Sequence, residues 1–437
     1  MKTFKKGGIH PPENKLTADS PIVEIPIPQE LRIMLSQSIG APSRPIVKPG
    51  EHVECGQMIA EAGGFVSAPL HSPVNGTVKK IEKTRTPQGI WQDSILIEPD
   101  EENPACSSVV PRTEEEINQL SSQEIISIVG DSGIVGLGGA TFPTRVKLSI
   151  PEGKNAEFVL INGAECEPCL TCDDALMRAE AENIIKGTLL IMKATSAPTG
   201  IIGIEENKPQ AIEAMTKAAS AYSNLSVVTL KKRYPQGGEK QLIYALTKRT
   251  VPAGALPIET GCIVDNVATA YAIYDAVYNR KPLTQRIMTV TGKKMANPGN
   301  FLVKNGTPIN HILEFAGGIP EDTGKIIAGG PMMGRAISCV EATATKGLSG
   351  LVLMPESESL RKPEGPCIRC ARCVSVCPMG LEPYLLMLQA DVKRWDDMSV
   401  HGVMNCLECG CCSYICPSSR PLLDMIKLGK QELRKKH

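Results

Sequence analysis

The sequence predicts a multidomain α/β protein built of four parts, with a strand-rich start, a layered middle and an α-helical end. At 437 residues the chain is too long for one ordinary hydrophobic core. Short β-branched runs come first, strand-like and helix-like segments then alternate, and two groups of cysteines lie near the C-terminus. These observations predict domains at residues 1–114, 115–285, 286–354 and 355–437.

Composition narrows the class of protein. The 47 basic and 47 acidic residues give a net charge of zero, which argues against bulk binding to nucleic acid. The start, MKTFKKGGIHPPENK, has no apolar stretch behind it, and no later run is long enough for a spanning helix. We therefore expect a cytosolic chain, or one held at a membrane by partners. That compartment keeps thiols reduced, so the 16 cysteines are expected to serve a purpose other than disulfides, metal ligation above all.

Residues 1–114 read as short strands joined by turns such as Asn75-Gly76. The stretch VKPGEHVECGQMIA, followed by SPVNGTVKKI, resembles the barrel-sandwich hybrid of lipoyl and biotinyl carriers. In those carriers a lysine at the hairpin tip accepts the cofactor. The tip region here, AGGFVSAPLHS, has no lysine, so the resemblance implies a scaffold and not a swinging arm.

The two middle parts differ in pattern. In residues 115–285 the apolar runs EFVLING, TGIIGIEE and SVVTLKK alternate with helical segments, which predicts a layered α/β domain. Residues 286–354 hold two strand-like runs and one helix in MTVTGKKMANPGNFLVKNGTPINHILEFAG, and they predict a β-grasp module.

Two cysteine runs in residues 355–437 share the spacing C-x2-C-x2-C-x3-C-P. Bacterial ferredoxins use this run, in which three thiolates hold one [4Fe–4S] cluster and the fourth reaches the other cluster. Structural zinc sites pair shorter C-x-x-C elements instead. We therefore expect two [4Fe–4S] clusters. The first would take Cys367, Cys370, Cys373 and Cys416, and the second would take Cys406, Cys409, Cys412 and Cys377.

The spacer between the runs is helical in pattern. Apolar residues recur in it at helical intervals, and they are Leu381, Tyr384, Leu385, Leu388 and Val392. This pattern favours an all-α ferredoxin-like domain over the βαβ kind. Cys411 lies outside the shared spacing and is expected to be a bystander thiol.

A glycine-rich stretch, GDSGIVGLGGATFPTRVKL, occupies residues 130–148. Its glycines let the backbone approach a phosphate or a flat ring that side chains would keep away. It is not G-x-G-x-x-G after a strand, so the Rossmann fingerprint fails. Taken alone, the motif fits a nucleotide loop or a tight turn from strand to helix.

Three further stretches follow the glycine-rich one: INGAECEP, RYPQGGEKQLIYAL and VDNVATAYAIYDAV. In this order, and followed by a β-grasp and cysteine runs, the four stretches resemble the NADH- and FMN-binding subunit of respiratory complex I. The chain resembles still more closely the C subunits of Rnf complexes, the ion-translocating ferredoxin:NAD oxidoreductases. Those subunits share the early GGIHPPENK and the doubled ferredoxin motif, so the resemblance covers nearly the whole chain.

The resemblance implies a set of residues that bind FMN and NAD(H). Lys147 would lie by the flavin, and Phe142 could stack on the adenine of the nicotinamide nucleotide. Asp265 or Asn266 can cap the helix whose N-terminus would favour the FMN phosphate. The full set is Gly136, Gly138, Gly139, Phe142, Lys147, Asn162, Glu165, Glu167, Tyr234, Gly237, Glu239, Asn266 and Thr269.

Some positions depart from the complex I pattern. Leu137 stands where that family has arginine, Ala164 where it has aspartate, and Gly238 where it has a second glutamate. These departures bear on how NADH is held more than on the flavin. The run CEPCLTC spaces Cys166, Cys169 and Cys172 as C-x2-C-x2-C; it could make a third metal site or three ordinary thiols near the flavin.

The resemblance implies an oxidoreductase subunit of a translocase that exchanges hydride with NAD(H) at FMN and passes single electrons through the two clusters. No general acid or base is required for that step, and no catalytic side chain is predicted. The expected partners are the membrane and iron–sulfur subunits of an Rnf-type complex at the cytoplasmic face of the cell membrane, with ferredoxin reached indirectly. Two alternatives stay open: the NADH-oxidising subunit of a soluble electron-bifurcating enzyme, and a non-enzymatic electron-carrying adaptor.

Overall fold

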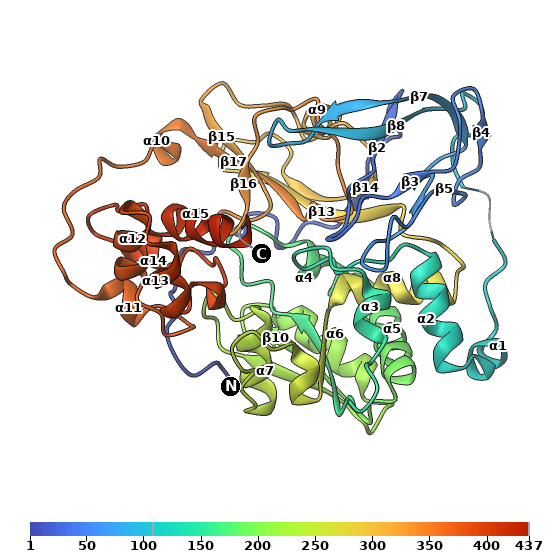
Figure 1. The fold of residues 1–437 in the computed structure, drawn as a ribbon. Helices are drawn as coiled ribbons and strands as arrows, with labels where there is room; N and C mark the ends of the chain where they lie inside the picture. The colour runs from blue at the N-terminus through green and yellow to red at the C-terminus, as the bar shows by residue number, and fades with distance from the viewer. Residues whose placement is uncertain (107–108, 436–437) are drawn as a thin grey trace.

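The computed structural model describes residues 1–106 and 109–435, and it separates into the architectural parts seen in Figure 1. A strand-rich N-terminal region and a mixed sheet lie above a layered α/β domain, and a small helical domain lies to one side. None of the helices in the described residues is long and apolar enough to cross a membrane.

The N-terminal region folds as two small antiparallel sheets around one core. One sheet has the order β2 (Leu31–Met34), β8 (Trp91–Pro99), β7 (Gly76–Arg85) and β4 (His52–Val53). The other joins β3 (Arg44–Pro45), β5 (Met58–Glu61) and β6 (Leu70–His71). Residues such as Ile33, Val53 and Ile97 fill the space between them and are buried almost completely. This arrangement is the predicted barrel-sandwich.

One pair of cysteines in this region corrects a sequence-based expectation. Cys55 and Cys106 form a disulfide, with Cα atoms 4.9 Å apart. The expectation that the cysteines of this chain serve only purposes other than disulfides is therefore wrong for this pair. Spacing gave no signal for it, because the two residues are 51 positions apart in sequence. The other described cysteines are free thiols.

The α/β domain begins with α1 (Glu114–Gln119), α2 (Ser122–Asp131) and α3 (Thr144–Leu148). Its sheet contains β9 (Phe158–Gly163), β10 (Thr199–Glu205), β11 (Leu225–Leu230) and β12 (Cys262–Asn266), all parallel. The helices that cover it are α4 (Cys172–Ala179), α5 (Ala181–Thr195), α6 (Pro209–Ala219), α7 (Glu239–Thr247) and α8 (Val267–Val277), with a short 3-10 turn at Pro257–Thr260.

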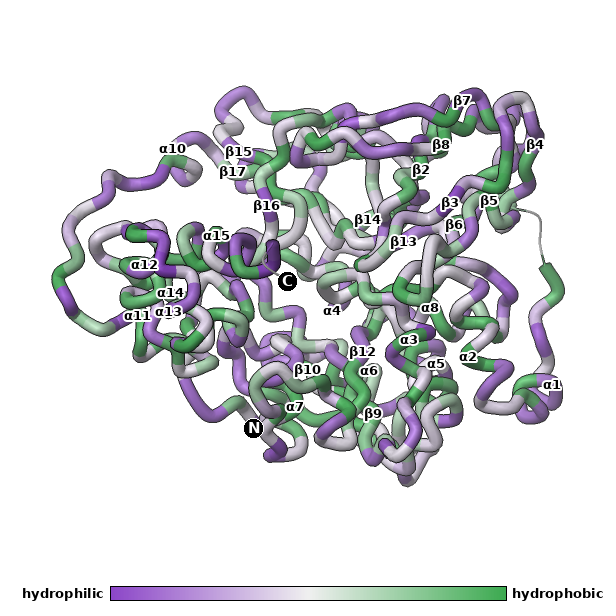
Figure 2. Tube along the Cα trace, in the orientation of Figure 1, coloured by the Kyte–Doolittle hydropathy of each residue, from purple (hydrophilic) through white to green (hydrophobic). Residues whose placement is uncertain are grey.

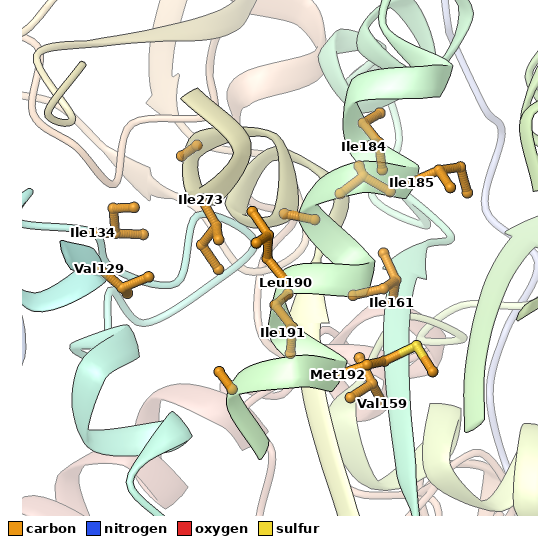
Figure 3. Close-up of a cluster of buried hydrophobic side chains, with 14 of the residues drawn as sticks. Val129, Ile134, Val159, Ile161, Ile184, Ile185, Leu190, Ile191, Met192 and Ile273 are labelled. Carbon is orange, nitrogen blue, oxygen red and sulfur yellow. The ribbon is translucent and has the colours of Figure 1, made fainter. Parts of the chain in front are cut away.

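The core of this domain lies where α5 crosses α8 above the sheet. In Figure 3, Leu190 and Ile191 of α5 lie between Ile273 of α8 and Val159 of β9. The two helices approach closely because Gly187 has no side chain, and a Cβ there would lie 1.9 Å from the Ala270 carbonyl. Burial of this apolar surface fixes α8, and with it the carboxyl end of β12.

In the strand order β11-β10-β9-β12 the chain builds the sheet outward from β9 to β10 and β11, and then returns to place β12 on the other side of β9. The direction of the connections therefore reverses between β9 and β12, although all four strands are parallel. In open parallel sheets, ligands bind outside the carboxyl ends of the strands at such a reversal. Asn162 at the end of β9 and Asn266 at the end of β12 are register partners across this point. The fold therefore provides a binding crevice although the glycine-rich stretch lacks the Rossmann fingerprint.

The mixed sheet contains β1 (Ile22–Glu24), β14 (Gly299–Lys304), β13 (Gln285–Gly292), β17 (Gly350–Pro355), β15 (Thr323–Ala328) and β16 (Arg335–Ala336), in that spatial order. Helix α9 (Ile309–Phe315) packs on it through Ile309 and Ile312. Strand β1 comes from the N-terminal part of the chain and pairs in parallel with β14. The N-terminal region and the mixed sheet are therefore joined by main-chain hydrogen bonds between β1 and β14.

The C-terminal domain is helical, as the spacer pattern predicted. It contains α11 (Arg372–Ser375), α12 (Pro383–Asp391), α13 (Trp395–Val400), α14 (Cys411–Ile415) and α15 (Leu422–Lys435), after the short α10 (Glu356–Ser359) and with a 3-10 turn at Val403–Asn405. Leu386 and Ala390 of α12 enter the core. Leu388 and Val392, which the periodicity grouped as one apolar stripe, are 48% and 65% exposed.

The first residues of the chain run between the α/β domain and the C-terminal domain. Ile9 exchanges two main-chain hydrogen bonds with Tyr234, of 2.9 and 3.0 Å, and the Gly8 amide donates to the Val376 carbonyl at 2.8 Å. A Cβ on Gly7 would lie 2.5 Å from the carbonyl carbon of Cys377. The early GGIHPPENK motif is thus a connector that fixes the cysteine domain against the α/β domain.

A buried lysine joins three of the parts. Lys346 is 1% exposed, and its ammonium donates to the carbonyls of Pro69 at 2.9 Å and Gly133 at 2.7 Å. Its amide donates to Gln37 at 2.9 Å. Because desolvation disfavours the charged form, burial lowers the pKa of Lys346 to about 7. The glycine-rich loop that begins after Gly133 is anchored by this contact.

This lysine predicts a pH dependence of stability. Between pH 7 and about 10 the unfolded chain holds a proton on Lys346 that the folded chain has released, so stability rises as the pH rises. Lys346→Met has no such proton. Urea titrations at pH 7 and pH 9 should show the unfolding free energy of the wild type rising by about 2 kcal/mol relative to Lys346→Met. An equal pH dependence in both proteins would contradict the assignment.

Candidate functional site

Several of the predicted FMN and NAD(H) residues gather at the switch point of the parallel sheet. The Leu137 amide donates to Thr269 Oγ1 at 2.9 Å, which holds the glycine-rich loop on α8. A Cβ on Gly138 would lie 2.8 Å from the Asn266 side chain, so only glycine fits there without a shift. Gly139 faces open space, because a Cβ added there would meet no atom within 4 Å. The exposed loop therefore leaves its main chain accessible above the strand ends.

The helices α4, α6, α7 and α8 each follow a strand of the parallel sheet, so their N-termini lie at this same edge. Asn266 caps α8, its Oδ1 accepting from the Ala268 amide at 2.8 Å, and its Nδ2 donates to Asp173 Oδ2 at 2.7 Å. Glu165 accepts from the amides of Asp173 at 2.7 Å and Asp174 at 3.3 Å at the start of α4. Helix N-termini favour anions, so a phosphate group suits this edge.

A lysine and two acids occupy the space beside α7. Lys147 Nζ donates to the Val264 carbonyl at 2.6 Å and to Asp265 Oδ1 at 3.1 Å. Burial by itself would lower the pKa of Lys147, but Asp265 and Glu239 outweigh it and raise that pKa. The second oxygen of Asp265 is buried and has no hydrogen-bond partner in the part of the chain that the structure describes. An unpaired buried acceptor is unfavourable, so the group fits a bound ligand with polar ring atoms.

Glu167 and Tyr234 lie at the boundary with the cysteine domain. Glu167 accepts from the amides of Met332 at 3.0 Å and Met333 at 2.8 Å, on the loop after β15. Tyr234 is 2% exposed, and its hydroxyl donates to the Cys409 carbonyl at 2.8 Å and lies 3.4 Å from Glu167. Burial raises the pKa of Glu167 to about 7 against the opposing amide donors. The two residues join the α/β domain to a predicted cluster ligand.

A chain of contacts leads from the strand edge to that boundary. Asn162 Nδ2 donates to the Gly237 carbonyl at 2.9 Å, and the Gly237 amide donates to Cys166 Sγ at 3.3 Å. Tyr234 belongs to the same turn as Gly237. Phe142 is half-buried at the end of the glycine-rich loop, where its carbonyl accepts from Gly136 at 2.9 Å. Predicted flavin residues and predicted cluster ligands thus belong to one continuous structure.

The predicted ligands of the second cluster surround one small cavity. Cys377 from the first run lines it together with Cys406, Cys409 and Cys412 from the second. Amides of Leu381 and Glu408 donate to the sulfurs of Cys377 and Cys406 at 3.3 and 3.4 Å. Burial raises the pKa of Cys406 to about 11 and of Cys412 to about 12. Thiols this hard to ionise release their protons when a metal binds.

The predicted ligands of the first cluster are less enclosed. Cys373 and Cys416 are half-buried and each packs against the apolar group of Met387, Cys412 and Leu422. Cys367 and Cys370 lie on the exposed segment before α11. The first set of sulfurs is therefore at the surface of the domain, whereas the second set faces its interior.

The two cysteine runs share a backbone conformation that side-chain bearing residues rarely adopt. Arg369 and Ala371 both have φ of 56°, and the matching positions of the second run, Glu408 and Gly410, have 59° and 78°. Left-handed residues other than glycine are energetically costly, and surrounding structure must hold them in place. The same strained wrap at both runs fits the same kind of ligand in each.

The spacing of sulfur atoms bears on the choice between zinc and an iron–sulfur cluster. A single tetrahedral zinc needs sulfurs about 4 Å apart, because each Zn–S bond is about 2.3 Å. Over residues 1–106 and 109–435, the only three potential ligand atoms that lie within 4.8 Å of one another belong to Glu165, Cys172 and Asp173. No three sulfurs of the two runs therefore come close enough together, in the described residues, for a single zinc ion.

The third cysteine motif does not form a comparable site. Cys166 accepts from the Gly237 amide, whereas Cys172 Sγ donates to the Ser349 carbonyl at 3.4 Å. Cys169 packs against Leu170 in another small apolar cluster. Both oxygens of Glu165, beside Cys172, already accept amides of α4. The three thiols thus meet different partners next to the predicted flavin residues.

Sequence reasoning missed several residues of the site. Lys15 donates to the carbonyls of Glu165 at 3.0 Å, Glu167 at 3.2 Å and Leu170 at 2.5 Å, and so supports the whole acidic loop. Asp173 Oδ2 accepts a hydrogen bond from Asn266 Nδ2. Lys15 is the last residue of the early GGIHPPENK motif, and that motif was the sequence signal that could have pointed to it. Nothing in the spacing of Asp173 distinguishes it from an ordinary acid at the start of a helix.

Family models match each part of the chain. Residues 2–102 match the RnfC barrel sandwich hybrid domain, and residues 129–275 match the Nuo51 FMN-binding domain. Residues 287–336 match the SLBB domain, and residues 360–417 match the 4Fe-4S dicluster domain. The four matches follow the predicted fold class in order.

Relatives extend over nearly the full chain. The C subunit of the Na(+)-translocating ferredoxin:NAD(+) oxidoreductase complex of Acetobacterium woodii is 42% identical over 433 residues, with 99% of this chain and 97% of the relative covered. The chain belongs to the family of Rnf-type C subunits. The C subunit of the proton-translocating complex of Clostridium ljungdahlii is 41% identical, covering 89% of this chain and 84% of the relative. The C subunit of the ion-translocating oxidoreductase complex of Rhodobacter capsulatus is 39% identical, covering 98% and 83%.

A solved structure supports the fold of this Rnf-type chain. An NAD+-reducing [NiFe]-hydrogenase in the H2-reduced state superposes with a TM-score of 0.50 at 18% identity, covering 77% of this chain and 69% of that chain. Together with the family matches, the predicted fold class is confirmed, as are an FMN domain and a dicluster domain.

Two neighbouring glycines of the loop in this Rnf-type chain provide a matched test. Gly138→Ala should destabilise the cofactor-free protein by about 1–3 kcal/mol, because the new methyl overlaps the Asn266 side chain. Gly139→Ala meets no protein atom and should leave that stability unchanged. If the loop cradles the flavin, both variants should bind FMN about tenfold more weakly, or about 1.4 kcal/mol, in a fluorescence titration. Wild-type FMN affinity in Gly139→Ala would contradict the cradle.

Proposed function

We propose that this chain is the electron-transfer subunit of an ion-translocating ferredoxin:NAD oxidoreductase, where it interacts with NAD(H). The observation that carries the proposal is the continuous structure from the switch-point crevice, through the Gly237 turn, to the buried cysteine set at Cys409. A bound FMN exchanges two electrons with a nicotinamide and single electrons with iron–sulfur clusters. The chain's own residues supply binding, orientation and exclusion of water.

The crevice residues divide into three groups by what they offer a flavin nucleotide. The loop at Gly136, Gly138 and Gly139 provides accessible main chain, and Thr269 holds it in place. Asn266 caps α8, whose N-terminus suits the phosphate. The polar group around Lys147 suits the ring edge. We assign the remaining predicted residues to this site as neighbours, and they are Phe142, Asn162, Glu165, Glu167, Tyr234, Gly237 and Glu239.

We assign the two cluster sites with crossed ligands. The inner cluster takes Cys406, Cys409, Cys412 and Cys377, and the shared cavity supports this set. The outer cluster takes Cys367, Cys370, Cys373 and Cys416, and the closeness of Cys373 to Cys416, which interact electrostatically beside one apolar group, supports it. Both runs have the left-handed residues that wrap a backbone around a compact ligand.

The order of the two clusters follows from what covers them. Tyr234, Met332 and the N-terminal segment contact the residues that carry the inner set, so this set lies next to the flavin domain. The outer set has its exposed cysteines on the far side of the domain. We infer that the inner cluster would lie between FMN and the outer cluster, so that single electrons would pass through it.

The curated relatives are subunits of multi-subunit complexes, and this chain is proposed to act in one. Its partners would be membrane and iron–sulfur subunits at the cytoplasmic face of the cell membrane, with ferredoxin reached through them. A net charge of zero gives no basis for nucleic acid as a partner. No structural observation in the described residues favours a soluble bifurcating enzyme or a flavin-free adaptor.

The proposed cofactors predict the iron and FMN content of the purified protein. Protein prepared without oxygen should hold FMN and about eight irons, four for each cubane. Cys377→Ala should fall to about four irons, because it removes a ligand of the inner cluster. Cys411→Ala is the matched control, since Cys411 lines the same cavity but lies outside the shared spacing, and it should keep about eight. Equal iron loss in both variants would contradict the assignment of Cys377, and not Cys411, as a cluster ligand.

The order of the clusters gives the test of function. NADH should bleach the flavin absorbance of the wild type, and electron paramagnetic resonance should show electrons on the clusters. In Cys377→Ala, NADH should still reduce the flavin while the outer cluster stays oxidised, because the intervening cluster is missing. In Cys416→Ala, reduction of the inner cluster should persist. Rapid reduction of the outer cluster in Cys377→Ala would reject the order, and a chain without NADH-reducible flavin would reject the function.

A further inference from the structure

The segment that carries the first cysteine run forms the outermost surface of the C-terminal domain. All residues from Leu360 to Arg372 are exposed except Gly365, which is half-buried. Two of them are large and apolar, Leu360 at 72% and Ile368 at 64% exposure. In Figure 1 the segment is the loop between α10 and α11, on the side away from the α/β domain. Figure 2 shows hydrophilic and hydrophobic stretches alternating along it.

The second cysteine run has no such exposure. Tyr234 reaches the Cys409 carbonyl, and a Cβ on Gly410 would lie 3.0 Å from the Met332 carbonyl oxygen. The N-terminal segment covers the end of the first run, where Gly8 donates to Val376. An external redox partner therefore has a direct approach to the outer cluster only.

The exposed segment is basic. Residues 360–373 contain four basic side chains, Arg361, Lys362, Arg369 and Arg372, and one acid, Glu364. Glu364 is paired with Arg420, and Arg361 is paired with Asp424 at 2.5 Å. Lys362, Arg369 and Arg372 form no ion pair with any residue that the structure describes. Three cations without ion pairs thus flank the exposed ligands in sequence.

Apolar side chains of α12 extend this surface. Arg420 contacts Glu364 and lies 3.6 Å from Asp391, so the end of α12 lies beside the exposed segment. Val392, next to Asp391, is 65% exposed, and Leu388 one turn earlier is 48% exposed. Apolar residues within a polar rim are typical of protein contact surfaces.

We propose that this outer-cluster face, formed by Leu360, Lys362, Ile368, Arg369, Arg372 and Val392, docks an acidic protein domain that carries its own iron–sulfur cluster. The inference rests on the proposed function and adds the surface and the chemistry of the partner. One electron moves between the partner's cluster and the outer cluster, and no bond or proton is transferred. Small interfaces steered by opposite charge suit such transient redox contacts.

An anionic membrane is the other surface that could attract cations and apolar side chains. Membrane-surface binding is typical of long amphipathic helices with a basic face. The outer-cluster face is instead an extended segment and the end of a short helix, and the segment carries two exposed predicted cluster ligands. A lipid would cover those ligands without exchanging electrons, so the observations favour a redox protein.

The test uses the full chain with FMN and both clusters, and an acidic two-[4Fe–4S] ferredoxin, reduced beforehand, as the probe. NAD+ reduction reports electron entry through the outer cluster, and NADH oxidation by ferricyanide reports the flavin. Lys362→Glu/Arg369→Glu should lower the second-order rate with ferredoxin about tenfold at low salt and weaken its salt dependence, because charge steers the encounter. Ile368→Gln should lower the rate and keep the salt dependence.

The control is Lys80→Glu, an exposed lysine on β7, far from the C-terminal domain in Figure 1. It should match the wild type in both assays. A wild-type ferredoxin rate in the double variant would overturn the proposal. So would a double variant that keeps its ferredoxin rate but loses binding to vesicles of phosphatidylglycerol. A wild-type protein without the ferricyanide reaction would instead count against the proposed function.

Discussion

The hydrogen bond from the Tyr234 hydroxyl to the Cys409 carbonyl crosses the one boundary that the proposed electron path has to cross. A relay between a flavin and a cluster works only if the two are held at a fixed, short separation in protein that excludes water. Tyr234 is 2% exposed, so its hydrogen bond lies in a dry environment where it is stronger and its loss is more costly. Ile9 flanks the same tyrosine with two main-chain bonds, so the junction is held from both sides.

The rest of the structure can be understood as support for that junction. Lys15 holds the acidic loop that contains Glu167 by a hydrogen bond to its carbonyl. The Glu167 carboxylate in turn accepts hydrogen bonds from two amides of the loop after β15. Lys346 fixes the other end of the crevice by binding carbonyls of two domains. Buried cations and acids of this kind are unfavourable unless each polar atom is paired. Their presence at domain boundaries makes the relative placement of the domains specific, whereas an apolar contact would tolerate sliding.

The sequence predicted the features that depend on local chemistry. Cysteine spacing, the glycine-rich loop and the alternation of strands and helices each reflect a short stretch of chain, and the corresponding elements are present. The C-terminal helix between the cysteine runs was predicted in type but not in orientation. Leu388 and Val392 match the helical period, yet α12 buries Leu386 and Ala390, because the choice between two apolar stripes depends on which side α15 packs.

Contacts between distant segments could not be read from the sequence for the same reason. Strand β1 pairs with β14, Cys55 pairs with Cys106, and the first ten residues connect two domains, and none of these has a spacing signature. The assignment of individual flavin and cluster ligands stays a prediction, since geometry can support such a role but only bound cofactors can test it. Glu167 and Tyr234 show why: the motif groups them with flavin residues, whereas Tyr234 donates to the cysteine domain and Glu167 accepts amides from the loop after β15.

The difference in exposure between the two cysteine sets is the last consequence of this architecture. A cluster that lies next to the flavin must be covered on that side, and the N-terminal segment, Tyr234 and Met332 provide the cover. The proposed crossed ligation would then place the outer cluster a short distance away, on the opposite side of a domain only a few helices thick. Since solvent exposure and nearby charge both influence reduction potential, the outer site with Arg369 and Arg372 and the inner site differ in environment as well as position. The fold of the cysteine domain therefore places one predicted set of cluster ligands beside the flavin domain and the other at the protein surface.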